Sequence, residues 1–177
     1  MISAENNKQS SHPLAFPIKM VWTTVGMIAA FHIVFTTFEK NYHIMVDTQE
    51  ERCIPEYSVY LVKKRIKSIE KGKIYAFKAS GMEPFFLDGV TIGKYASGIE
   101  GDTIVQNEQG VFINDQLTIE GYPSVDKLGV DASRFYKQYT LEQGEIFFTG
   151  TAPRSYDSRY WGAAKADQVI GEAIPLW

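Results

Sequence analysis

A run of nineteen residues near the start of the chain contains no charged side chain. It extends from residue 20 to residue 38 and reads MVWTTVGMIAAFHIVFTTF. As an α-helix, such a run spans roughly 28 Å at about 1.5 Å per residue, close to the thickness of a bilayer's hydrocarbon core. It is longer than the apolar part of a secretory signal, usually about 7–15 residues, and no small-residue cleavage pattern follows it. We therefore predict a transmembrane anchor at 20–38, with a buried core helix as the alternative.

The anchor separates a short tail, residues 1–19, from a larger part, residues 39–177. Lys8 and Lys19 precede it, and the cytoplasmic flanks of membrane helices carry an excess of Lys and Arg. We expect the tail to lie in the cytoplasm and residues 39–177 to lie across the membrane. With 177 residues in all, the chain has room for one core domain beyond the anchor.

Composition argues against several classes of function. The formal net charge is −3, so no global basic field points to nucleic acid as a partner. The single cysteine, Cys53, rules out an intramolecular disulfide bond. With only three histidines beside it, the chain shows no metal-ligand spacing, and we predict neither a metal nor another cofactor. The basic residues between 63 and 73 are interpreted as a solvated strand end and turn, with contact to anionic lipid head groups as the alternative.

Beyond residue 39 the sequence consists of short β-prone runs separated by turns, and helical periodicity is weak. The candidate strands are residues 58–62, 73–77, 90–94, 103–106, 111–113, 145–149 and 169–170. Asn107-Glu-Gln-Gly110 is expected to close a hairpin, and one short helical turn is expected between 125 and 134. The predicted fold class is mostly β, an antiparallel domain with one N-terminal transmembrane helix.

The residue types available favour one route to metal-free hydrolysis. Histidines occur only at position 12 before the anchor, position 32 within it and position 43 just beyond it, so a Ser-His-Asp triad is not expected. A lysine can act as the base instead when its amine is neutral, and burial in an apolar wall favours the neutral form. A Ser–Lys dyad therefore requires a lysine on a strand in an apolar setting, with a hydroxyl group to orient it.

Several segments, in the same order, resemble the boxes of type I signal peptidases, family S26. Lys94-Tyr-Ala-Ser-Gly-Ile-Glu-Gly-Asp102 resembles the box that opens with the general-base lysine and ends Gly-x-x-Gly-Asp. Gly72-Lys-Ile-Tyr-Ala-Phe77 resembles the strand before it. Ser155-Tyr-Asp-Ser-Arg-Tyr-Trp-Gly162 resembles the last box, and Val169-Ile-Gly-Glu-Ala173 the tail. The chain departs from the pattern at position 95, where it has tyrosine instead of arginine, and at position 100, where it has glutamate instead of proline.

The resemblance implies a role for each matching side chain. Lys94 would be the general base, and Ser155 would hydrogen-bond its amine. Asp157 and Arg159 would pair and hold the last box in place. The domain as a whole would be an antiparallel β catalytic domain of the signal-peptidase kind.

Two serines compete for the role of nucleophile. Ser80 lies in Ser-Gly-Met-Glu-Pro84, which resembles the Ser-Met-x-Pro box of general signal peptidases with an extra glycine. Ser58 lies in Cys53-Ile-Pro-Glu-Tyr-Ser-Val-Tyr60, which resembles the box of the conjugative-transfer, TraF-type branch. The family's serine follows the anchor and precedes the strand at 73–77, a position that Ser58 occupies and Ser80 does not. We therefore predict Ser58 as the nucleophile and Ser80 as the alternative.

Glu56 departs from the family pattern. General signal peptidases have a serine two residues before the nucleophile, where it supplies an oxyanion-hole hydroxyl, and an ionised carboxylate cannot donate a hydrogen bond. We expect Glu56 to point away and the backbone N–H of Ser58 to serve the oxyanion.

The predicted function is therefore a membrane-anchored serine endopeptidase that processes a precursor protein tethered to the membrane. The TraF-type resemblance implies a conjugative prepilin as substrate, with hydrolysis and cyclisation both open. It also implies the bacterial inner membrane, with the catalytic domain on the periplasmic side, and other transfer-apparatus proteins as partners. The alternatives are a non-catalytic anchored β subunit of a conjugation or secretion apparatus, and a general signal peptidase.

Overall fold

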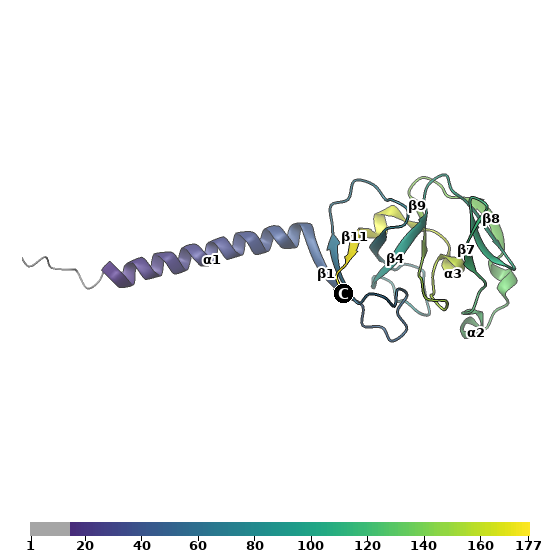
Figure 1. The fold of residues 1–177 in the computed structure, drawn as a ribbon, viewed down its shortest axis with the longest axis horizontal. Coiled ribbons are helices and arrows are strands. Elements are labelled where there is room, and N and C mark those ends of the chain that lie inside the picture. Colours follow the sequence, from purple (N-terminus) through teal and green to yellow (C-terminus); the bar gives the residue numbers. More distant parts are fainter. Residues whose placement is uncertain (1–14) are drawn as a thin grey trace, which may run out of the picture. The chain divides into compact units, whose positions relative to one another are not determined.

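The computed structural model describes residues 15–177, in two compact units that divide after Lys40. The first described element is α1 (Ala15–Asn41), drawn as a long single helix in Figure 1. From Ile18 to Asn41 it is long and apolar enough to cross a membrane, and none of its most apolar window is buried. The predicted anchor at 20–38 lies within this helix. Most of the predicted tail, including Lys8, lies outside the described residues.

The second unit, Asn41–Trp177, contains two antiparallel sheets. The larger sheet has the strand order β1-β2-β11-β3-β4-β9-β10. Its strands are β1 (Tyr42–Val46), β2 (Val59–Lys63), β3 (Ile74–Lys78), β4 (Thr91–Gly98), β9 (Glu145–Thr149), β10 (Ala164–Lys165) and β11 (Val169–Pro175). The C-terminal strand β11 therefore lies between β2 and β3, which separates β2 from β4 by two strands.

The smaller sheet has the order β7-β6-β5-β8, and Figure 1 shows it at the end of the β-rich unit marked by β7 and β8. Its strands are β5 (Thr103–Asn107), β6 (Gly110–Ile113), β7 (Gln116–Glu120) and β8 (Lys137–Thr140). The predicted hairpin at 107–110 joins β5 to β6. Asn114 and Asp115 close the next hairpin with positive φ angles of 50° and 64°, as a type I′ turn requires.

The helical pieces of this unit are short. The predicted turn between 125 and 134 is formed by α2 (Val125–Leu128) and a 3₁₀ turn, Ala132–Phe135. A second short helix, α3 (Ser158–Trp161), lies inside the segment that resembles the last box, and a 3₁₀ turn at Ala166–Gln168 follows it. This architecture, mostly antiparallel β with one apolar N-terminal helix, confirms the predicted fold class.

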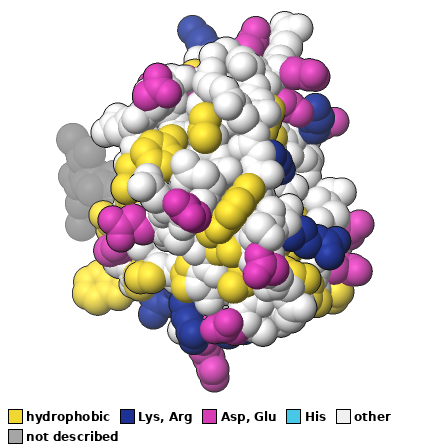
Figure 2. Space-filling view, turned by 90° about the vertical axis from the view of Figure 1, so that its right-hand side faces the viewer, with side chains coloured by type: hydrophobic (Ala, Val, Ile, Leu, Met, Phe, Trp, Pro, Cys, Tyr) yellow, Lys and Arg dark blue, Asp and Glu magenta, His cyan; other side chains and the backbone are white. Residues whose placement is uncertain are grey.

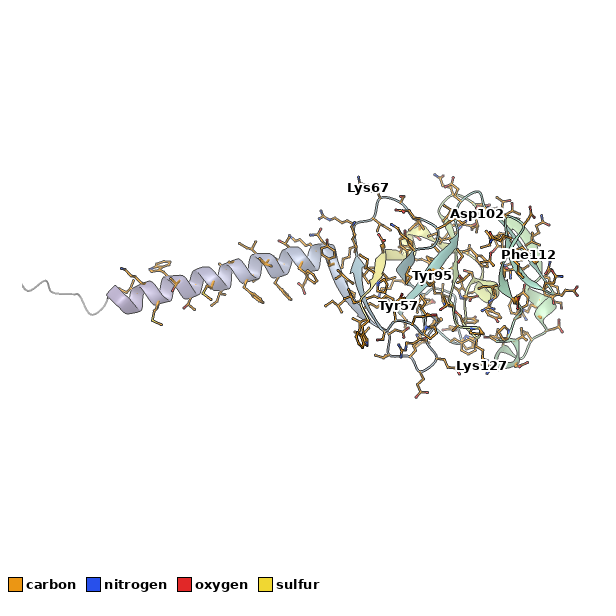
Figure 3. All side chains as sticks on the ribbon, in the orientation of Figure 1. Tyr57, Lys67, Tyr95, Asp102, Phe112 and Lys127 are labelled. Atoms are coloured by element: carbon orange, nitrogen blue, oxygen red, sulfur yellow. The ribbon has the colours of Figure 1, made fainter. Side chains whose placement is uncertain are left out.

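The β-rich unit buries its apolar side chains in three clusters. The cluster beneath β3, β4 and β9 contains Cys53, Tyr75, Phe77, Ala79, Met82, Phe86, Ile92, Ala96, Ile146, Phe148 and Ala164. Stacking of Phe77 on Phe148, with ring centroids 4.1 Å apart, joins β3 to β9 across it. A second cluster lies around β2 and β11, and Tyr57 and Tyr95, labelled in Figure 3, pack against it. The third cluster lies between β5, β6 and β9.

Charged side chains are interspersed on the surface of the β-rich unit. On the face drawn in Figure 2, acidic and basic side chains alternate with hydrophobic ones and do not gather by sign. Two lysines of the basic segment are paired: Lys71 contacts Asp102, and Lys73 contacts Glu70 and Glu172. These pairs support the interpretation of the segment as an ordinary solvated strand end and turn.

Candidate active site

Lys94 lies on the buried face of β4. Burial alternates along this strand, so that Ile92, Lys94 and Ala96 point to the same apolar side. The residue has 0% exposure, and its ammonium lies 5.8 Å from the centre of the Phe86 ring. The structure thus places a lysine in the apolar wall that the sequence analysis requires of a lysine base.

Two side chains accept hydrogen bonds from the Lys94 ammonium. Lys94 Nζ donates to Ser155 Oγ at 3.0 Å and to Cys53 Sγ at 2.8 Å. No carboxylate among residues 15–177 forms an ion pair with it; the described ion pairs involve other lysines and Arg159. A buried amine is costly unless its hydrogen-bonding groups are satisfied, and here a hydroxyl and a thiol accept from it.

A glycine allows Cys53 and Ser155 to approach the same point. A Cβ atom at Gly150 would collide with Ser155 Oγ and with the Cys53 carbonyl oxygen. That carbonyl accepts the backbone N–H groups of Thr151 at 2.9 Å and Ala152 at 3.1 Å, which ties the Cys53 segment to the loop after β9. Only glycine leaves room for this contact.

The buried Asp157–Arg159 pair stabilises the same loop. Arg159 Nε donates to Asp157 Oδ1 at 2.8 Å and Nη2 donates to Oδ2 at 3.0 Å, and both side chains are buried. Nη2 also donates to the Ser155 carbonyl oxygen at 3.0 Å, and Nη1 donates to the carbonyl oxygen of Gly121 at 3.2 Å. Burial alone would lower the pKa of Arg159, but the Asp157 carboxylate and its hydrogen bonds raise it. The pair that the resemblance implies is present, and it fixes the Ser155 backbone.

The structure does not bring Ser58 to Lys94. Ser58 lies directly before β2, and its hydroxyl donates to the carbonyl oxygen of Trp177 at 3.4 Å. Because β11 and β3 separate β2 from β4, three strand spacings of about 4.8 Å put the two strands roughly 14 Å apart. The two acceptors of the Lys94 ammonium are other residues.

Ser80 and Glu56 lie outside this cluster as well. Ser80, the alternative nucleophile, is exposed in the loop between β3 and β4. Glu56 accepts a hydrogen bond from Thr151 Oγ1 at 2.9 Å and is not a partner of Lys94. The expectation that Glu56 points away from the lysine is consistent with this contact.

Cys53 is the site residue that the sequence analysis missed. It follows the anchor and precedes β3, so it meets the positional criteria that selected Ser58. A Ser–Lys dyad requires a hydroxyl nucleophile, and a thiol does not meet that requirement. Its place directly before Ile54-Pro55, in a box that resembles a signal-peptidase segment, is the signal that could have found it.

Cys53 and Ser155 both line a pocket of about 870 Å³, whereas Lys94 does not. The apolar part of the lining consists of Pro55, Phe85, Phe86, Pro123, Ala152, Pro153 and Tyr156. The charged part includes Glu51 and Lys127, which form an ion pair at 2.6 Å. Figure 3 labels Lys127 on the side of the β-rich unit opposite Asp102. A peptide in this pocket would thus meet a thiol and a hydroxyl, each hydrogen-bonded to a buried amine.

Comparison with known proteins identifies a family. A family model described as signal peptidase, peptidase S26, matches residues 17–177. A solved structure of a signal peptidase I from Enterococcus faecalis V583 is 26% identical; the match covers 61% of this chain and 98% of that chain, with a TM-score of 0.39. No curated protein matches.

Proposed function

The chain belongs to the signal peptidase family, peptidase S26, and we propose that it is a membrane-anchored endopeptidase that cleaves precursor proteins. The observation that carries the proposal is the Lys94 amine, fully buried, hydrogen-bonded to Ser155 and adjacent to a peptide-sized pocket. In this arrangement Lys94 takes the proton of the attacking group and later delivers it to the leaving amine. Ser155 orients the amine through its hydroxyl.

Helix α1 supports the membrane part of the proposal. An enzyme held by a helix such as Ile18–Asn41 meets substrates that are themselves tethered to the bilayer, which raises their effective concentration. We propose that α1 anchors the chain in the bacterial inner membrane, with residues 39–177 on the periplasmic side. The lysine bias before the anchor supports this orientation.

The proposed substrate is a conjugative prepilin. Its support is the resemblance of Cys53-Ile-Pro-Glu-Tyr-Ser-Val-Tyr60 to the TraF-type box. Other proteins of a transfer apparatus are the proposed partners. The apolar lining of the pocket suits small apolar residues before the cut, held by a few polar groups.

The experiment uses the full-length protein in membrane vesicles with two precursors, a conjugative prepilin and an ordinary secretory precursor. We expect cleavage of the prepilin, and loss of cleavage by at least about 10²-fold in Lys94→Met at an equal amount of folded protein. Product mass separates the two outcomes of the reaction, because a cyclised pilin lacks one water relative to the hydrolysed product. Faster cleavage of the secretory precursor would identify a general signal peptidase instead.

If neither precursor is cut, the result supports the alternative of a non-catalytic subunit. Cleavage that persists in Lys94→Met would also contradict the proposed mechanism, because the base would then be another group. Ser68→Ala is the matched control, since Ser68 is exposed and remote in sequence from every site segment.

A further inference from the structure

Cys53 occupies the place at Lys94 where a Ser–Lys peptidase would need its nucleophile. Its Sγ atom accepts a hydrogen bond from Lys94 Nζ at 2.8 Å, and its side chain lines the pocket. It is a free thiol, the single cysteine of the chain, with 7% exposure. Most buried cysteines are inert packing residues. This one differs because it contacts a buried amine that has no carboxylate partner among the described residues.

Among residues 15–177, Ser155 is the other group that is hydrogen-bonded to the amine, so the two must be compared. A thiol gives up its proton to an amine more readily than an alcohol does, and sulfur is the stronger intrinsic nucleophile. The backbone of Ser155 is fixed in the loop by two hydrogen bonds. Its carbonyl oxygen accepts from Arg159, and its N–H donates to the Ala152 carbonyl oxygen at 2.9 Å. These contacts suit a residue that positions the lysine.

The backbone beside Cys53 also suits acyl transfer. The tetrahedral intermediate of acyl transfer carries an oxyanion, which requires an N–H donor next to the nucleophile. Within residues 15–177, the Cys53 N–H has no acceptor, whereas the N–H groups of Ser155 and Ser58 are both used, by Ala152 and Trp177. Cys53 thus combines a nucleophile, a base and an available donor.

We propose that Cys53 is the nucleophile, so that the site is a Cys–Lys dyad oriented by Ser155; this rests on the proposed peptidase function. Lys94 Nζ takes the thiol proton, and the thiolate sulfur attacks the scissile carbonyl carbon. The carbonyl π electrons move to the oxygen and return as the C–N bond breaks, while Lys94 returns the proton to the leaving amine. A thioester between Cys53 and the precursor remains. Water attacks it and gives a proton to Lys94, the C–S bond breaks, and the thiolate regains that proton.

The test compares substitutions at the three candidate nucleophiles in the full-length protein, with prepilin cleavage as the readout. We expect Cys53→Ala to lower the rate by about 10³-fold or more. Ser58→Ala and the control Ser68→Ala should stay within about twofold of wild type. Ser155→Ala should lower the cleavage rate by about 10- to 10²-fold, an intermediate loss, because it removes only the group that orients the base. Thermal unfolding of each variant confirms that the domain is folded.

A cleaving Cys53→Ala variant would overturn the proposal while leaving the peptidase function in place. Loss of cleavage in Ser58→Ala or in Ser155→Ala would then identify the actual nucleophile. Cys53→Ser is the matched variant, since it keeps a nucleophilic atom of similar size; we expect slower cleavage that iodoacetamide no longer inhibits. Failure of iodoacetamide to inhibit the wild type would also contradict the proposal.

A second readout is independent of any precursor. Because Cys53 is the only cysteine, alkylation by iodoacetamide reports on this thiol alone. We expect the full-length wild type to be alkylated at least about tenfold faster than Lys94→Met, because only the thiolate reacts. Equal alkylation rates in the two proteins would overturn the proposed dyad, even if no precursor is cut. This measurement therefore tests the dyad separately from the proposed peptidase function.

Discussion

The side chains of Cys53 and Lys94 are 41 residues apart in the sequence, and the Lys94 ammonium donates to the Cys53 thiol at 2.8 Å. The contact joins the loop before β2 to the middle of β4. The same ammonium donates to Ser155 at 3.0 Å, on the segment after β9. Three distant parts of the chain therefore meet at one buried amine, and the following predictions test how they are held there.

Replacement of Lys94 by methionine should separate function from stability. Methionine has a similar length and no amine, so Lys94→Met removes a buried polar group from an apolar wall. Burying a polar amine costs free energy, so its replacement by an apolar side chain of similar size should be neutral or stabilising. We expect cleavage to be lost while the unfolding temperature of the β-rich unit stays the same or rises, as measured by circular dichroism. A clear fall in unfolding temperature would show that Lys94 has a structural role.

Gly150→Ala should impair both stability and cleavage. The new Cβ would collide with Ser155 Oγ and the Cys53 carbonyl oxygen, so the two site segments would have to separate. Overpacking of this kind typically costs about 1–3 kcal/mol. Urea titration measures the loss of stability, and the precursor assay measures the loss of activity.

Gly26→Ala is the control for this substitution, because a Cβ there would have no neighbour within 4 Å. We expect it to cleave at the wild-type rate. A fully active Gly150→Ala variant would contradict the close approach described above.

Asp157→Asn should strongly destabilise the domain. It leaves the Arg159 guanidinium buried with neutral partners alone and no counter-charge, and breaking a buried pair typically costs about 3–5 kcal/mol. The exposed pair between Lys165 and Glu145 is the matched control, and Lys165→Ala should cost about 1 kcal/mol or less. Denaturant unfolding of both variants under one set of conditions measures the difference. Equal losses would contradict the role of the buried pair as a brace.

Asp102 should make stability depend on acid pH. Burial raises the pKa of its carboxyl, but the Ile99 N–H, the Lys71 ammonium and the Asn114 amide together lower it below its usual value. A lowered pKa in the folded state gives stability that is present above the unfolded pKa and is lost as the pH falls through the folded one. The wild type should therefore lose stability below about pH 4 more steeply than Asp102→Asn. Parallel pH profiles for the two proteins would contradict this assignment.

The sequence was sufficient to predict Lys94, Ser155 and the Asp157–Arg159 pair because each lies in a short segment with recognisable local spacing. It was not sufficient to place the predicted serines relative to Lys94, because that placement depends on strand order. β11 is C-terminal in the sequence but lies between β2 and β3, and this displaces Ser58 from β4. Such long-range pairing leaves no local pattern.

The sheets were predictable to different degrees for a related reason. β3 and β9 carry runs of buried apolar residues, and their predicted and observed ranges largely agree. β4 alternates between buried and partly buried residues, and it extends to Gly98, beyond its predicted end at residue 94. β8 is mostly exposed and polar, so it lacks the alternation by which a strand is recognised. β7 is also mostly exposed, and its alternation rests on two apolar residues, Leu117 and Ile119. β1 follows α1 directly, with no turn residues to mark its start.

The most direct test of the Cys–Lys dyad is the identification of the acylated residue. Full-length protein is mixed with its precursor, quenched in acid within one turnover, digested and analysed by mass spectrometry. We expect an acyl group on the peptide that contains Cys53, removable by hydroxylamine as a thioester, and no such adduct in Lys94→Met. An acyl group on Ser58 or Ser155, with Cys53 unmodified, would contradict it.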